Sequence, residues 1–133
     1  MKLTTKSEYA LLIMIFLART EADQFARLED ICATYDLSQK YAEQLTSTLK
    51  KSGLVAARRG VAGGYQLARP AAEISMAEIV RLMDGALAPI GAISEYFPCR
   101  SLLEKETGVM NVMQDIRDYT ANIMEGKTLA DLA

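Results

Sequence analysis

Hydrophobic residues recur at helical spacing over most of this chain, and one short stretch alternates instead. The first apolar run, "YALLIMIFLA" at residues 9–18, follows two threonines that can cap a helix continuing to Arg19. After the polar connection "TEADQFA", the segment "RLEDICATY" at residues 27–35 sets its apolar side chains on one face. These patterns predict a long helix followed by a short amphipathic one.

A third helix and a hairpin complete the first half of the pattern. Ser38 follows the tight turn "DLS" as an N-cap, and the helix has Leu45 on its apolar face and Gly53 as its stop. The runs "LVAARR" and "GYQLAR" then alternate around a glycine-rich turn, which predicts two strands. Helix, helix, turn, helix and hairpin is the order of a winged helix-turn-helix, with a recognition helix over 38–52 and a wing over 58–65.

The second half predicts two further helices separated by a loop. In "ISMAEIVRLMDG", Ser75 and Glu78 have the spacing of a capping box. A loop of about 20 residues leads to a long helix, and "KTLADLA" closes the chain as a short capped turn. The long helix carries an apolar stripe of Val109, Val112, Met113, Ile116, Tyr119 and Ile123.

The predicted fold is mainly α with a small β-hairpin wing. We expect a winged helix-turn-helix DNA-binding domain over 1–84, an effector or sensor loop over 85–106, and a dimerisation helix with a C-terminal turn over 107–133. The first part has enough apolar helix for its own core, so the late stripe is predicted to be the interface of a homodimer. A two-fold pair would set two recognition helices about one DNA turn apart, which suits a palindromic operator.

Composition agrees with a folded chain. Half of the 133 residues are hydrophobic and only three are proline. The first apolar run is shorter than the roughly 20 residues that span a bilayer, so we expect a buried helix and no membrane partner. Two distant cysteines do not make a disulfide framework, which favours a reducing, cytoplasmic location.

The net charge of −2 is unevenly distributed. Residues 1–70 carry ten Lys and Arg against seven Asp and Glu, whereas residues 71–133 carry five against ten. A basic first half and an acidic second half suggest that the first half meets an anionic partner.

The outward face of the third helix carries the candidate base-reading side chains. With Leu45 in the core, the far side holds Lys40, Glu43 and Gln44, and Gln39 lies in the first turn. Glutamine can pair with adenine, lysine can contact guanine or phosphate, and glutamate can accept from cytosine. From the helix alone, a solvated polar face remains an equal interpretation.

The turn of the hairpin favours DNA binding. Arg58 and Arg59 precede Gly60, and Gly63 and Gly64 close the turn. Arginine suits a narrow, negative minor groove, and glycine permits positive φ and close backbone approach. The alternative is a plain hairpin with charged flanks.

Reactive chemistry is scarce in the sequence. Cys32 falls on an apolar helix face and is predicted to be a core residue, whereas Cys99 lies in the loop beside Arg100, which would favour its thiolate. Cys99 is therefore the sensor candidate. The chain has no histidine and no catalytic or metal-binding motif, so we predict that it is not an enzyme.

Several stretches together resemble the IscR/NsrR/CymR family of bacterial transcriptional regulators. They are "MKLTTKSEYAL", "LSQKYAEQL", "LKKSGLVAARRGVAGGYQLARP" and "ISMAEIVRLMDG", and the resemblance returns in the long helix and in "TLADL". It implies a homodimeric winged-helix repressor or activator that dimerises through the long helix. It also implies that Arg59 enters the minor groove and that the major groove is read by Ser38, Lys40, Tyr41, Glu43 and Gln44.

The loop departs from the family pattern. Many members hold an iron–sulfur cluster there with three cysteines, but this loop offers Cys99 alone. The other ligand positions of the family fall near Ala92, Ser101, Thr107 and Met110, and these side chains do not hold iron as thiolates do. We therefore predict no cofactor and no stable cluster. A small-molecule or protein effector, or oxidation of Cys99, would supply the signal.

Two functions from different classes compete. The first is a sequence-specific regulator that binds double-stranded DNA. The second is a protein-interaction adaptor that has kept the fold and lost DNA binding.

Overall fold

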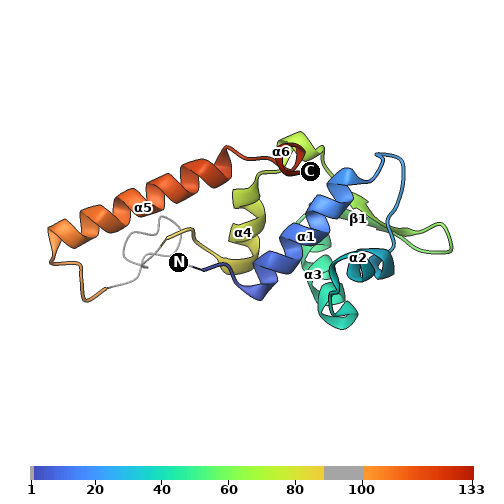
Figure 1. Cartoon of the computed structure of the whole chain (residues 1–133), viewed down its shortest axis with the longest axis horizontal. Helices are drawn as coiled ribbons and strands as arrows, with labels where there is room; N and C mark the ends of the chain where they lie inside the picture. Colours follow the sequence, from blue (N-terminus) through green and yellow to red (C-terminus); the bar gives the residue numbers. More distant parts are fainter. Residues whose placement is uncertain (1, 89–100) are drawn as a thin grey trace.

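The computed structural model describes residues 2–88 and 101–133, and it is mostly helical with one two-stranded hairpin (Figure 1). The elements in chain order are α1 (Thr5–Arg19), α2 (Leu28–Tyr35), α3 (Gln39–Lys51), β1 (Val55–Arg58), β2 (Gly64–Leu67), the 3-10 turn η1 (Ala71–Glu73), α4 (Met76–Asp84), α5 (Thr107–Glu125) and α6 (Leu129–Leu132). This architecture confirms the predicted fold class.

Helix α1 is the centre of the core. Thr4 caps it by accepting a hydrogen bond from the Ser7 N–H at 3.3 Å. Ile13 and Met14 are fully buried, because α1 packs against α3 on one side and α4 on another. An apolar run on nearly every face of a helix is typical of such central positions.

The connection between α2 and α3 is the tight turn of a helix-turn-helix. Asp36 ends α2 in the left-handed conformation, with φ of 54°, which a short polar side chain tolerates. Ser38 then caps α3 as predicted, accepting from the Tyr41 N–H at 3.4 Å. Leu45 and Leu49 face the core, so the opposite side of α3 is left outside.

The wing is an antiparallel hairpin in which Val55 pairs with Leu67 and Arg58 pairs with Gly64. A third segment adds to it, because Ala26 and Tyr65 exchange two backbone hydrogen bonds of 2.8 and 2.7 Å. A Cβ on Gly64 would lie 2.3 Å from the Ala26 carbonyl oxygen. The glycine therefore allows this segment to approach the hairpin closely.

Helix α4 corrects one detail of the sequence prediction. Ser75 caps it by accepting from the Glu78 N–H at 3.1 Å. The Glu78 carboxylate, however, pairs with Arg69 at 2.6 Å instead of completing the capping box. The Glu78 side chain, which the local pattern assigned to the cap, therefore pairs with the guanidinium of Arg69.

The C-terminal turn packs into the first half of the molecule. Thr128 and Asp131 form a complete capping box at the start of α6. Leu129 is fully buried in the main core, and its N–H donates to the Ile74 carbonyl at 2.9 Å. Residues from both ends of the chain therefore share one core.

Helix α5 extends away from that core, at the end opposite the wing (Figure 1). Five of the six residues in the predicted stripe are exposed, among them Val112 at 56% and Tyr119 at 70%. Met113 is half-buried. Among the described residues, no helix is long and apolar enough to cross a membrane.

Candidate nucleic-acid interface

The N-terminus of α3 is fixed by a tyrosine of α1. The Ser38 N–H donates to the Tyr9 hydroxyl at 3.2 Å, and the Tyr9 and Tyr41 rings meet edge to face with centroids 5.0 Å apart. Such an aromatic pair adds to the stability gained from burial alone. The first turn of α3 is therefore held in a defined position relative to the core.

The outward face of α3 is polar and exposed, as the sequence predicted. The exposed side chains of α3 are Gln39, Lys40, Glu43, Gln44, Ser47, Thr48, Lys50 and Lys51. The pattern missed Thr46, which is fully buried and donates its hydroxyl hydrogen bond to the Glu43 carbonyl at 3.0 Å. That local bond satisfies the hydroxyl inside the core, so its burial costs little.

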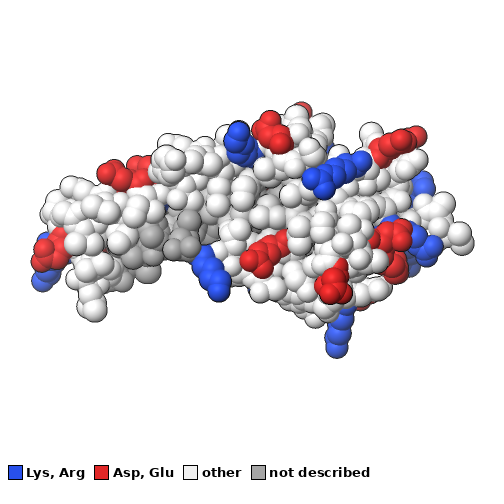
Figure 2. Space-filling model, in the orientation of Figure 1, with Lys and Arg blue, Asp and Glu red and all other residues white. Residues whose placement is uncertain are grey.

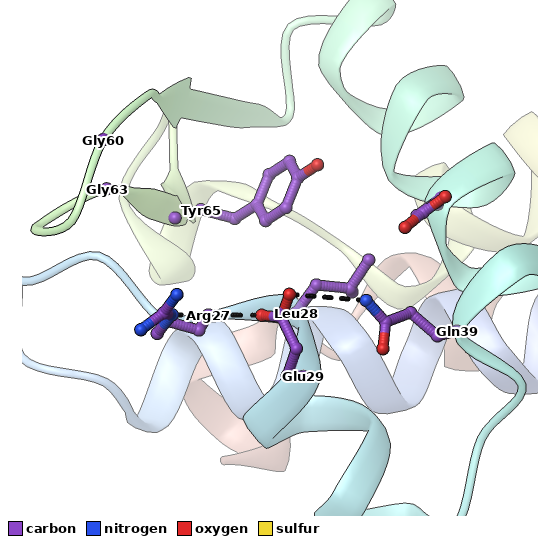
Figure 3. A pocket seen from close by; sticks show the side chains of 9 residues that line it. Arg27, Leu28, Glu29, Gln39, Gly60, Gly63 and Tyr65 are labelled. Atoms are coloured by element: carbon purple, nitrogen blue, oxygen red, sulfur yellow. Dashed lines mark hydrogen bonds and ion pairs between the residues drawn. The ribbon is translucent and has the colours of Figure 1, made fainter.

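Glu29 lies beside this face, which sequence reasoning did not anticipate. It accepts a hydrogen bond from the Gln39 side-chain amide at 3.3 Å and lies 4.0 Å from Arg27 (Figure 3). The charged residues at the start of α2 gave no sign of this contact, because it joins two helices across the turn.

A cleft of about 260 Å³ separates α3 from the wing. Its walls come from the start of α2, the first turns of α3 and the wing turn, and Figure 3 shows the Tyr65 ring on the wing side. The lining residues are Arg27, Leu28, Glu29, Gln39, Glu43, Gly60, Gly63, Gly64 and Tyr65. The structure thus brings together five of the predicted glycine and helix positions with two charged residues at the start of α2, Arg27 and Glu29.

The two wing arginines differ in their surroundings. The Arg58 guanidinium lies 4.2 Å from the centroid of the Phe25 ring and donates to the Ala62 carbonyl at 2.8 Å. Arg59 is exposed and makes no ion pair or hydrogen bond with any described side chain. The sequence alone could not show that Arg58 contacts Phe25 and Ala62 while Arg59 remains free of such contacts with the described residues.

Basic and acidic side chains are interspersed on the face shown in Figure 2, and no single basic patch covers it. The surface over α5 on that face is largely uncharged. Attraction of a polyanion by net charge alone is therefore weak, and recognition would depend on a few well-placed side chains.

The described residues contain no group of three or more His, Cys, Asp or Glu side chains that could hold a metal ion. Cys32 is buried as expected, and burial, followed by the nearby Glu29 and Glu43 carboxylates, raises the pKa of its thiol. Cys99 and Ala92 lie outside the described residues. The donors at the other expected positions, the hydroxyls of Ser101 and Thr107 and the Met110 thioether, do not fit an iron–sulfur cluster.

A helix-turn-helix with its second helix exposed beside a hairpin wing defines the class of winged-helix transcriptional regulators. Within that class the chain belongs to the Rrf2 family, described as iron-dependent transcriptional regulators, which it matches over residues 3–133. Its relatives are regulators and not enzymes, in agreement with the sequence prediction.

Two regulators that carry the family names inferred from the sequence are similar to this chain. It is 35% identical to the regulator CymR of Bacillus subtilis over 133 residues, which is all of this chain and 90% of CymR. The solved structure of CymR, the global cysteine regulator of B. subtilis, superposes with a TM-score of 0.87, covering 100% of this chain and 96% of that one. The structure of T. potens IscR gives a TM-score of 0.78 at 29% identity, covering 99% of this chain and 85% of that one.

Proposed function

We propose that this chain is a homodimeric, sequence-specific DNA-binding transcriptional regulator. The observation that carries the proposal is the joint exposure of the α3 polar face and of Arg59, which precedes the wing turn that lines the same cleft. A helix and a hairpin presented in this way suit a major groove and the adjacent minor groove. A protein that acts on chromosomal DNA in bacteria would work in the cytoplasm.

Helix α3 would supply the contacts in the major groove. Gln39, Lys40, Glu43 and Gln44 are exposed in its first two turns, where recognition helices present side chains to base edges. Ser38 and Tyr41, at the N-terminal end of the helix, would join them in the major groove. Glu43 would mainly reject unsuitable sites, because its carboxylate repels phosphate and accepts only from bases that offer a donor.

The exposed stripe on α5 supports dimerisation. Val109, Val112, Ile116, Tyr119 and Ile123 would remain in water in a monomer. Contiguous apolar surface of this kind marks an interaction site in soluble proteins. A two-fold pairing through α5 would place two copies of α3 on a palindromic operator.

The regulatory signal would act at the loop over 85–106, most of which lies outside the described residues. With one cysteine in that loop and no histidine in the chain, we propose that no stable iron–sulfur cluster forms. Oxidation of Cys99, a small ligand or a protein partner would take the role of the cluster.

Replacing Arg59 by alanine tests the proposed function. We expect Arg59→Ala to weaken binding to a duplex selected by the wild type by about 1–3 kcal/mol, whereas the matched control Arg19→Ala, at the end of α1 and not on the wing, should bind normally. Fluorescence anisotropy at matched salt measures both. Equal affinities would remove the wing from the mechanism. Failure of the wild type to select any duplex would instead favour the adaptor function.

A further inference from the structure

The Arg58 side chain joins two segments that are distant in sequence. Phe25 belongs to the connection between α1 and α2, whereas Arg58 ends β1 on the wing. The guanidinium lies 4.2 Å from the centroid of the Phe25 ring, within the distance of a cation–π contact. It also donates to the Ala62 carbonyl in the wing turn at 2.8 Å. One side chain therefore connects the wing turn to the segment that precedes α2.

The backbone joins the same two segments at the next residue. The Ala26 N–H donates to the Tyr65 carbonyl, and the Tyr65 N–H donates back to the Ala26 carbonyl, at 2.8 and 2.7 Å. The backbone pair at Tyr65 and the contact between Arg58 and Phe25 therefore both hold the end of the hairpin that leads into the wing turn. We call these two side chains the wing clamp.

Apart from the clamp, the turn is held by one backbone hydrogen bond, from the Gly63 N–H to the Gly60 carbonyl. It contains Gly60, with φ of 104°, and Val61, which is 94% exposed. A glycine-rich turn has many accessible conformations, and binding that must first order it loses affinity. Contacts that fix the turn in advance reduce that loss.

We propose that Arg58 is a positioning residue for DNA binding: it holds the wing against Phe25 so that Arg59, and not Arg58, contacts the DNA. This inference rests on the proposed DNA-binding function and assigns Arg58 a role different from the contact that its place in the sequence predicts. It also gives Phe25 a part in DNA binding without any contact to DNA.

The salt dependence of binding distinguishes a positioning arginine from one that contacts phosphate. Each neutralised phosphate changes the slope of log K against log [salt] by about 0.9. We expect Arg58→Ala to weaken operator binding about 5- to 20-fold with no change in slope. Phe25→Leu should weaken operator binding to a similar degree, and the double variant should bind no more weakly than either single variant. Phe25→Tyr keeps the aromatic ring and should retain wild-type affinity.

The experiment is a fluorescence anisotropy titration over a salt series, with Arg59→Ala as the reference for a contacting residue and Arg19→Ala as the neutral control. Because Arg59 in the minor groove would neutralise a neighbouring phosphate, Arg59→Ala should lower the slope by about 1. A similar fall in slope for Arg58→Ala, or additive losses in the double variant, would overturn the inference. A wild type that binds no duplex would instead refute the proposed function.

Hydrogen exchange tests the clamp itself without DNA. The Gly63 N–H donates to the Gly60 carbonyl at 3.0 Å in the wing turn. Its exchange should become faster in both Arg58→Ala and Phe25→Leu, while amides in α4 should exchange at the wild-type rate. Unchanged exchange at Gly63 in folded variants would show that the clamp does not order the turn and would overturn the inference.

Discussion

At the scale of single residues, the environment of Cys32 shows why it is a poor candidate for redox or metal chemistry. Its side chain is buried on the core face of α2, and burial together with Glu29 and Glu43 raises the pKa of the thiol. The reactive form of cysteine is the thiolate, which a raised pKa makes scarcer near neutral pH. Any thiol-based sensing in this chain therefore falls to Cys99.

We predict that the protein purified without oxygen contains no stoichiometric iron or sulfide, since one available thiolate cannot hold a cluster. Iron and sulfide assays measure this outcome. A brown protein with near-stoichiometric iron would contradict it.

We also expect peroxide to change the operator affinity of the wild type and to leave that of Cys99→Ser unaffected. Anisotropy titrations measure this outcome, with Cys32→Ser as the control that should behave as the wild type. Equal responses of the wild type and Cys99→Ser to peroxide would contradict it.

At the scale of helices and strands, local sequence patterns predicted the structure correctly where the structure of a segment depends on that segment alone. Ser38 and Ser75 cap the helices that follow them, as their spacing predicted. Contacts between distant segments could not be predicted in this way. The pairing of Ala26 with Tyr65 and the burial of Leu129 both depend on how separate elements come together. The same holds for the candidate site. The exposed face of α3 was predicted from its own sequence, whereas the contact between Glu29 of α2 and Gln39 of α3 was not.

Helix α5 carries the prediction that belongs to this scale. Ile116→Glu should convert a dimer into monomers, because a carboxylate placed in an apolar interface is costly to desolvate. Light scattering at micromolar concentration measures the mass. Asn111→Glu is the matched control, since Asn111 is exposed on α5 outside the stripe. A monomeric wild type, or a variant that remains dimeric, would contradict the assignment of the stripe.

At the scale of the whole molecule, α4 connects the DNA-binding end to α5. Arg81 of α4 forms an ion pair with Glu125 near the end of α5. In the same last turn of α4, Asp84 accepts hydrogen bonds from the backbone N–H and the hydroxyl of Thr4, just before α1. Partial burial raises the pKa of Asp84, but these bonds outweigh that effect and hold the pKa below its usual value. The ionised Asp84 carboxylate therefore stabilises the contact between the end of α4 and the start of α1 at neutral pH. That contribution to the free energy of unfolding is lost as the pH falls through the lowered pKa.

The central claim is that two copies of this chain read one two-fold DNA site. The most direct measurement is the selection of genomic fragments by the purified wild-type protein, followed by sequencing. We expect enrichment of a two-fold symmetric motif whose half-sites are separated by about one helical turn or a whole multiple of it. Retention no better than that of non-specific DNA, or a single motif without symmetry, would contradict the claim.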